Sequence, residues 1–235
     1  MTSPKRRPVV LVALTVGALA SAAALASGSG ARAAESSTAR ISADKACYVN
    51  TNSASGAPMT VSGIGFTPNG TVAISGGGVS TTATVTSDGE FVVATKAPIL
   101  SSSGPGSMSA TLTATEQTGT GGPAVSATTV VRSANLAVAT KPSSVRNVRK
   151  DKVTFSFSGF TPGKHIYGYY MRKKIVARAR FAAAGGPCGT LRQRALLYPG
   201  GRPRSSQYNV AFESTSRYSK TAFPRVTGKL TILHF

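Results

Sequence analysis

A five-residue phrase that occurs twice constrains this chain more than any other feature. It reads Gly65-Phe66-Thr67-Pro68-Asn69 in the first copy and Gly159-Phe160-Thr161-Pro162-Gly163 in the second. The phrase predicts a type II turn, because proline presets φ at the second turn position and the third position needs φ > 0. Gly163 supplies a positive φ freely, and Asn69 tolerates it. Each copy is therefore expected to join two strands.

The residues around both turns repeat at the same offset of 94 positions, without a gap. Before each turn, apolar positions alternate with threonine and serine, and one apolar residue follows the turn. Alternation with a period of two is what a half-buried strand requires. The repeated unit is therefore a strand, a tight turn and a strand. Its matched apolar positions are Met59, Val61, Gly63 and Val72 in the first copy and Val153, Phe155, Phe157 and Ile166 in the second.

Residues 1–33 have the three parts of a signal peptide. Lys5 to Arg7 form a positive start, Val9–Ala26 is an apolar run, and Ala31-Arg32-Ala33 offers the small-x-small pattern of a cleavage site. We predict cleavage before Ala34 and an exported protein without a transmembrane segment in its mature chain.

Three alternatives remain open for this leader. Ala24-Leu25-Ala26 is a second candidate cleavage site, and the apolar run is near the lower length limit of a transmembrane anchor. Arg6-Arg7 is compatible with the twin-arginine route, although Pro8 follows and the usual downstream pattern is missing. The export route, general secretory or twin-arginine, is therefore left open.

Charge is distributed very unevenly over the rest of the chain. Residues 34–133 carry four Lys and Arg against five Asp and Glu, whereas residues 134–235 carry nineteen against two. We therefore predict a neutral module at 34–133 and a strongly basic module at 134–235, after the signal peptide at 1–33.

Short β-rich runs separated by Gly, Ser, Asn and Pro fill both halves, and this spacing is typical of Ig-like sandwiches. The predicted fold is all-β, with two tandem Ig-like antiparallel β-sandwich modules. The predicted strands are Cys47–Val49, Pro58–Ile64, Thr71–Ser75, Ser80–Thr86, Glu90–Thr95, Ser107–Thr115, Val125–Arg132, Leu136–Ala139, Asp151–Ser158, His165–Tyr170, Ile175–Phe181, Leu191–Leu197, Tyr208–Ser214 and Arg225–Leu233.

Four segments carry further predictions. Asp88-Gly89 lies between two β-rich runs and predicts a hairpin that joins them. The polar stretch Glu35–Asp44 predicts an irregular leader, and Ser133–Pro142 predicts the link between the modules. Ile175–Ala184 could instead be helical, because Ala and Arg are good helix formers, but its alternation favours a strand.

Several motifs resemble known families. Val61 to Pro68, followed by Val72 and later by Asp88-Gly89-Glu90-Phe91, resembles the bacterial Ig-like modules of secreted and surface proteins. The second copy, with Gly186-Pro187-Cys188-Gly189-Thr190-Leu191 and Tyr218-Ser219, is similar to the C-terminal module of secreted actinobacterial proteins of unknown activity. A looser likeness exists to apoproteins of the neocarzinostatin type, which are also small secreted Ig-like sandwiches. Their short-loop disulfides cannot form in this chain.

The sequence offers little for catalysis or metal binding. The chain has two histidines, His165 at a strand start and His234 next to the C-terminus, and seven acidic residues without a cluster. A nucleophilic device needs a histidine held by a second group in a pocket, and a metal site needs several ligands at suitable spacing. We predict no enzymatic activity, no metal site and no cofactor.

The chain contains two cysteines, Cys47 and Cys188. In an exported protein this number predicts a single disulfide, which would fix the two modules against each other. Two buried or free thiols are the alternative.

The basic half carries the one functional signal. Arg172, Lys173 and Lys174 form the tip of a predicted hairpin, and the tyrosines of its first strand place aromatic rings among cations. Dense positive charge attracts polyanions. The remaining candidate residues of the polyanion-binding surface are Arg178 and Arg180 on one strand and Arg192 and Arg194 on another.

These features predict an exported, non-enzymatic binding or adhesion-type protein that is secreted, and any attachment to the cell wall is expected to be non-covalent. Its basic module would associate with an anionic cell-wall polymer or polysaccharide, and sequence-specific nucleic-acid binding is not expected. The alternatives are a secreted carrier of a small apolar ligand, a protein-contact module whose charge is only solvated, and a hydrolase that uses His165.

Overall fold

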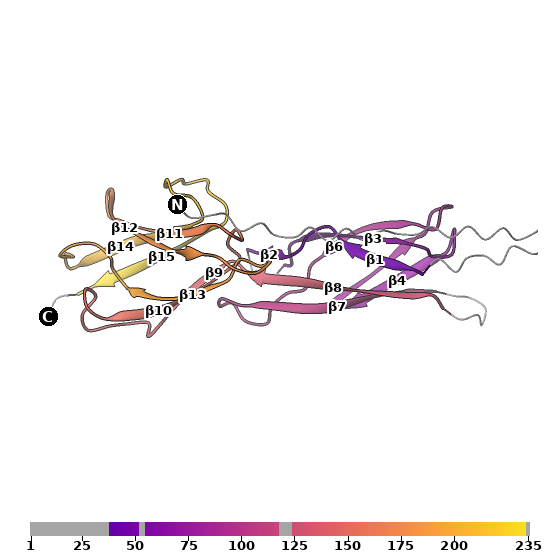
Figure 1. Cartoon of the computed structure of the whole chain (residues 1–235), viewed down its shortest axis with the longest axis horizontal. Coiled ribbons are helices and arrows are strands. Elements are labelled where there is room, and N and C mark those ends of the chain that lie inside the picture. Colours follow the sequence, from indigo (N-terminus) through magenta and orange to yellow (C-terminus); the bar gives the residue numbers. More distant parts are fainter. Residues whose placement is uncertain (1–37, 52–54, 118–123, 234–235) are drawn as a thin grey trace, which may run out of the picture. The chain divides into compact units, whose positions relative to one another are not determined.

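The computed structural model describes residues 38–51, 55–117 and 124–233. In this part of the chain every regular element is a strand and none is a helix (Figure 1). The protein has an all-β sandwich fold, as predicted. The predicted signal peptide and His234 lie outside the described residues. The strands are β1 (Arg40–Ala43), β2 (Tyr48–Asn50), β3 (Pro58–Ile64), β4 (Thr71–Gly76), β5 (Val79–Thr84), β6 (Phe91–Lys96), β7 (Ser107–Glu116), β8 (Ser126–Asn135), β9 (Ala137–Lys141), β10 (Lys152–Ser158), β11 (His165–Met171), β12 (Ile175–Ala183), β13 (Leu191–Leu196), β14 (Ser206–Glu213) and β15 (Arg225–Ile232).

The described strands form four sheets around two hydrophobic cores. The sheets β1-β3-β6 and β2-β8-β7-β4-β5 enclose the first core, in which Tyr48, Met59 and Phe91 are buried. The sheets β13-β10-β9 and β12-β11-β14-β15 enclose the second core, which is built around Phe155 and Phe181. Neighbouring strands pair antiparallel, except that β2 and β8 pair parallel. Two cores fit the two proposed modules, and the boundary between residues 133 and 134 stays a prediction.

The repeated phrase has the same structure in both halves. Strands β3 and β10 begin and end at positions 94 residues apart, and β4 and β11 begin at the same offset. The amide of Gly70 donates to the carbonyl of Thr67 at 3.2 Å, and the second turn has the same bond at 3.2 Å. The third turn residues have positive φ, 60° at Asn69 and 74° at Gly163. The predicted strand, turn and strand unit is confirmed in each half.

A second repeated contact was not anticipated from the sequence. The amide that follows the first glycine of each phrase donates to a distant glycine carbonyl, from Phe66 to Gly89 at 3.1 Å and from Phe160 to Gly189 at 3.2 Å. Both acceptor glycines have positive φ, 78° and 58°. A Cβ on Gly189 would lie 1.6 Å from the carbonyl oxygen of Phe160. The backbone is therefore so close at this point that only glycine fits.

Replacing Gly189 by alanine should destabilise the second core strongly. The Cβ cannot be placed without moving the backbone of Phe160, in addition to the left-handed strain of about 1–2 kcal/mol. Gly186 is a matched control in the same loop, because its φ is 64° but a Cβ there would meet nothing within 4 Å. Chemical unfolding of the two variants should show a small loss for Gly186→Ala and a larger one for Gly189→Ala. Equal losses would mean that the close approach is not required.

Three sequence predictions about connections were wrong. The expected irregular leader contains β1, whose Ile41 is buried in the first core while its backbone pairs with β3. Asp88-Gly89 makes a turn but no hairpin, since β5 pairs with β4 and β6 pairs with β3 in the other sheet. The expected linker Ser133–Pro142 is mostly strand, because β8 ends at Asn135 and β9 begins at Ala137.

The predicted disulfide is confirmed. Cys47 and Cys188 are bonded, with their Cα atoms 5.3 Å apart across a sequence separation of 141. The bond joins the segment before β2 to the loop that precedes β13. Ser158, at the end of β10, also connects the two halves of the chain. Its hydroxyl donates to the carbonyl of Asn135 at 2.6 Å and accepts from the amide of Gly106 at 3.0 Å.

Buried tyrosines make the fold sensitive to alkali. Burial raises the pKa of Tyr48 to about 12, and its hydrogen bond to the Asp44 carboxylate acts in the same direction. Burial also raises the pKa of Tyr170. In the unfolded chain both phenols ionise near pH 10, so unfolding releases protons above that value. The contribution of these phenols to the free energy of unfolding should be fully present below about pH 10. It should decrease as the pH rises towards about 12. Unfolding curves at increasing pH test this, and Tyr170→Phe should reduce the slope. A stability that is constant over this range would contradict it.

Candidate functional site

The larger of the two sheets around the second core, β12-β11-β14-β15, carries polar and charged side chains on its outer face. Tyr170, Val210 and Phe212 point into the core, so their neighbours along each strand point outwards. Arg178 and Arg180 lie on this outer face, opposite Tyr169 and Tyr167 respectively on β11.

Cations and aromatic rings are interleaved on this face, as the sequence indicated. The guanidinium carbon of Arg178 lies 4.6 Å from the ring centroid of Tyr167 and 5.7 Å from that of Tyr169. These are cation–π distances. Arg178 is thus held against the sheet while its side chain stays exposed.

His165 has a cation next to it where a catalytic histidine would have a carboxylate. Its Nδ1 lies 2.8 Å from the carbonyl oxygen of Phe181, and its Nε2 lies 2.8 Å from an Arg180 nitrogen. Because the guanidinium only donates, Nε2 accepts and Nδ1–H donates. Both ring nitrogens are used, and neither bonds a nucleophile or an acid. This geometry differs from that of a catalytic triad.

A loop from Ser214 to Pro224 covers one end of the outer face. Tyr218 packs edge-on against Tyr169, with ring centroids 5.5 Å apart, and the Tyr169 hydroxyl donates to the carbonyl of Thr215 at 2.9 Å. Beneath the loop, the fully buried carboxylate of Glu213 accepts a hydrogen bond from the amide of Ser219 at 3.1 Å.

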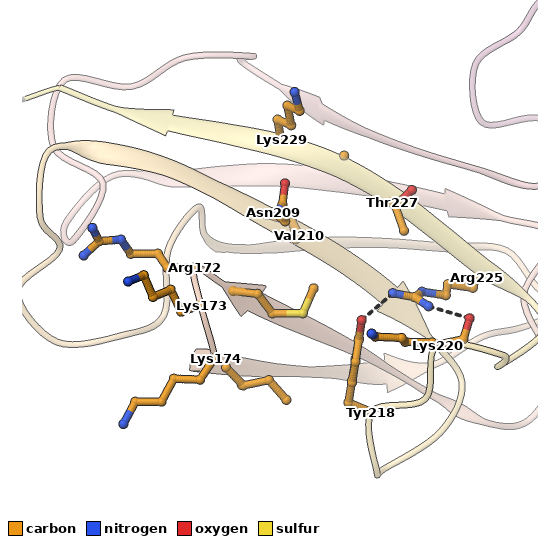
Figure 2. A pocket seen from close by; sticks show the side chains of 13 residues that line it. Arg172, Lys173, Lys174, Asn209, Val210, Tyr218, Lys220, Arg225, Thr227 and Lys229 are labelled. Carbon is orange, nitrogen blue, oxygen red and sulfur yellow. Dashed lines mark hydrogen bonds between the residues drawn. The ribbon is translucent and has the colours of Figure 1, made fainter.

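Arg225 connects this loop to β15. Its guanidinium donates to the Tyr218 hydroxyl and to the Lys220 carbonyl, each at 2.7 Å (Figure 2). It also donates to the Ser219 carbonyl at 3.2 Å. It also lies over the Tyr218 ring, 4.9 Å from the centroid. The loop is therefore fixed by several directional bonds.

A groove of about 700 Å³ lies between this loop and the tip of the β11–β12 hairpin. Figure 2 shows Arg172, Lys173 and Lys174 on one side of it and Tyr218 with Arg225 on the other. None of its lining residues is acidic. The lining residues are Met171, Arg172, Lys173, Lys174, Ile175, Asn209, Val210, Tyr218, Lys220, Arg225, Thr227, Gly228 and Lys229.

The cations of this groove have no carboxylate partner. Among the described residues, the ion pair within 4.0 Å is Lys45 with Asp44, outside the second core. Glu213, the acid nearest in register to Arg225, is fully buried under the loop. Unpaired, exposed ammonium and guanidinium groups around one concave surface are suited to an anion that carries several charges.

The structure brings together most, but not all, of the predicted polyanion-binding residues. Arg172, Lys173 and Lys174 line the groove, and Arg178 and Arg180 lie on the same sheet. Arg192 and Arg194 lie on β13, which belongs to the other sheet. That expected surface is therefore divided between two sheets.

Three cations of the groove were missed. Arg225 and Lys229 are separated by even steps along one strand with Thr227 between them, so alternation could have placed them on one face. Lys220 lies in the loop, and no periodic signal places it.

The described residues contain neither a cluster of metal ligands nor a membrane-spanning helix. No three His, Cys, Asp or Glu side chains there gather as metal ligands. No helix in the same part of the chain is long and apolar enough to cross a membrane.

Comparison with known proteins gives only distant structural similarity. No protein-family model matches the sequence, and no curated protein is similar to it. Among solved structures, a tetra-tandem repeat from the extending region of a large adhesion protein has 19% identity and a TM-score of 0.27, covering 82% of this chain and 48% of that chain. A Ca²⁺-stabilised adhesin with which an Antarctic bacterium binds ice has 14% identity and a TM-score of 0.29, covering 83% and 48%. A bacterial ice-binding adhesin studied for host cell surface retention has 11% identity and a TM-score of 0.27, covering 82% and 62%. This chain spans about half the length of the first two, and TM-scores this low assign no role to it.

Proposed function

We propose that this is an exported, non-enzymatic binding protein that attaches to an anionic polymer of the cell envelope or its surroundings. The observation that carries the proposal is the groove on the outer face of the β12-β11-β14-β15 sheet, which has six cationic side chains and no acidic one in its lining. A protein surface with this density of positive charge raises the local concentration of polyanions and accelerates their encounter with the protein.

The surface around the groove supports a polymer rather than a single small anion. Arg178 and Arg180 continue the positive charge along β12, on the same sheet as the groove. The side chain of Tyr218 is part of the lining, which gives the C–H face of a sugar ring a surface to pack on. A repeating anion can therefore make several charge contacts at successive positions.

The remaining parts of the proposal concern the whole chain. Residues 134–235 form the basic binding module, and residues 34–133 form a neutral spacer or protein-contact module. The disulfide between Cys47 and Cys188 supports an oxidising, extracellular location. The anionic partner is a wall polymer or acidic polysaccharide, and sequence-specific nucleic-acid recognition is not proposed.

The test is retention of the mature protein on immobilised polymers across a salt series. A phosphodiester wall polymer and a sulfated polysaccharide provide the anions, and a neutral polysaccharide is the control. Retention on both anionic resins should fall steeply with salt, because bound counterions are released when the charges pair. Retention that is indifferent to salt, or equal on the neutral resin, would support the contact-module alternative instead.

A further inference from the structure

The two sheets around the second core are open along one edge. Among the strands that the structure describes, β9 is the edge strand of one sheet and β15 is the edge strand of the other. A cleft of about 240 Å³ enters between these two edge strands and reaches the core. It adjoins the basic groove, with which it shares the edge-strand residues Thr227, Gly228 and Lys229 and also Val210. Its chemistry differs, since its inner walls are apolar side chains from four strands and one loop. The side chains that form these inner walls are Val138, Phe155, Leu197, Val210, Phe212, Val226 and Leu230.

The polar residues Thr140, Ser143, Thr227 and Lys229 of the cleft are exposed or half-buried, whereas the phenol of Tyr170 is buried among the apolar side chains. Tyr170 is 1% exposed, and its hydroxyl has no hydrogen-bond partner among the described residues. The ring packs edge-on against Tyr198, with centroids 5.6 Å apart, which fixes the direction of the phenol. Buried polar groups in folded proteins are nearly always bonded, so the unbonded hydroxyl of a residue that lines the cleft leaves a donor that a bound molecule can satisfy. Burial also raises the pKa of Tyr170, which keeps the phenol a neutral donor.

Gly228 keeps the mouth of the cleft open. It occupies an inward-facing position of β15, between Val226 and Leu230, which both pack against the core. A Cβ at Gly228 would meet nothing within 4 Å. At this point the edge strand therefore leaves space where its neighbours would fill it.

We propose that this cleft binds a small, uncharged apolar molecule that carries one hydrogen-bond acceptor. The apolar walls favour a hydrocarbon body, and the Tyr170 hydroxyl donates to the single acceptor. A cavity of about 150 Å³ holds benzene, and by proportion a cleft of this volume holds about ten non-hydrogen atoms. The site is therefore smaller than a typical cofactor pocket.

Acetophenone and α-methylstyrene are suitable probes, because they have the same shape and differ in whether a carbonyl oxygen or a methylene group is present. We expect NMR titration of the mature protein to shift signals of Val138, Tyr170 and Leu230. Acetophenone should bind about fivefold more tightly, as a net gain of one hydrogen bond implies. Equal affinity of the two probes, or shifts confined to other residues, would overturn the proposal.

Two variants distinguish the role of the Tyr170 hydroxyl in binding from that of the space inside the cleft. Tyr170→Phe should keep binding of α-methylstyrene and remove the advantage of acetophenone. Gly228→Ile should abolish binding of both probes without unfolding the protein, since the added side chain enters open space. Gly201→Ile is the matched control, because a Cβ there also meets nothing within 4 Å and the residue does not line the cleft. Binding that survives Gly228→Ile, or is lost in Gly201→Ile, would contradict this location.

Discussion

Replacing Cys47 and Cys188 together by alanine should lower the free energy of unfolding by as much as about 5 kcal/mol. The bond closes a loop of 141 residues, and closing a loop of that length removes about this much conformational free energy from the unfolded chain. The other covalent connection between the cores is the short crossing from β8 to β9, and the Ser158 hydroxyl adds two hydrogen bonds near it. Loss of the disulfide should therefore also separate the unfolding of the cores into two transitions.

Urea unfolding of the oxidised protein, the reduced protein and the double variant measures this effect. Reduction of the unmodified protein is the matched control, because it breaks the bond without changing a side chain. The reduced protein and the variant should agree. A loss below about 1 kcal/mol in both would mean that the loop is already restricted in the unfolded state.

Replacing the five exposed cations of the groove by glutamine should remove most of the binding to an anionic polymer. The variant changes Arg172, Lys173, Lys174, Lys220 and Lys229 and keeps Arg225, whose guanidinium holds the neighbouring loop. Each phosphate contact on a flexible polyanion contributes about 0.7 to the slope of log affinity against log salt, so the slope should fall by about 3.5. Stability should change little, because exposed substitutions alter it by about 0.5 kcal/mol or less each.

A second variant with the same loss of charge provides the control for this experiment. It replaces five exposed cations that do not line the groove. If the groove is the site, this control should retain most of the salt slope. Equal weakening by both variants would show that total charge, and no particular surface, governs retention. The control positions are Arg146, Arg149, Lys150, Arg202 and Arg204.

The sequence predicted the strands well where alternation was strong. The apolar positions around both turns are all buried, from Met59 and Val61 to Phe157 and Ile166. It failed where the pattern is too short to carry a period. β1 has one core residue, Ile41, between polar neighbours, and its strand state comes from pairing with β3. Local turn chemistry at Asp88-Gly89 likewise did not reveal that the chain crosses to the other sheet.

The cations of the groove were predicted only in part, because only some of them are neighbours in the sequence. The cations in the β11–β12 hairpin are neighbours in sequence and remain neighbours in space. Lys220 and Lys229 reach the same groove through a loop and an edge strand that lie far along the chain from the hairpin. Arg192 and Arg194 look equivalent in sequence, but β13 pairs with β10 and so belongs to the other sheet. Which sheet a strand joins depends on long-range pairing, which local composition does not determine.

The disulfide has a mechanical consequence as well. A chain under tension between its two ends can lengthen only through residues that lie outside the covalent loop. The bond encloses strands β2 to β12, and thus most of the first core, within a span of 141 residues. At about 3.4 Å per extended residue, close to 480 Å of contour length is withheld from stretching. A protein held at one end by a surface polymer and pulled at the other would transmit force through this bond, while the enclosed strands carry little of the load.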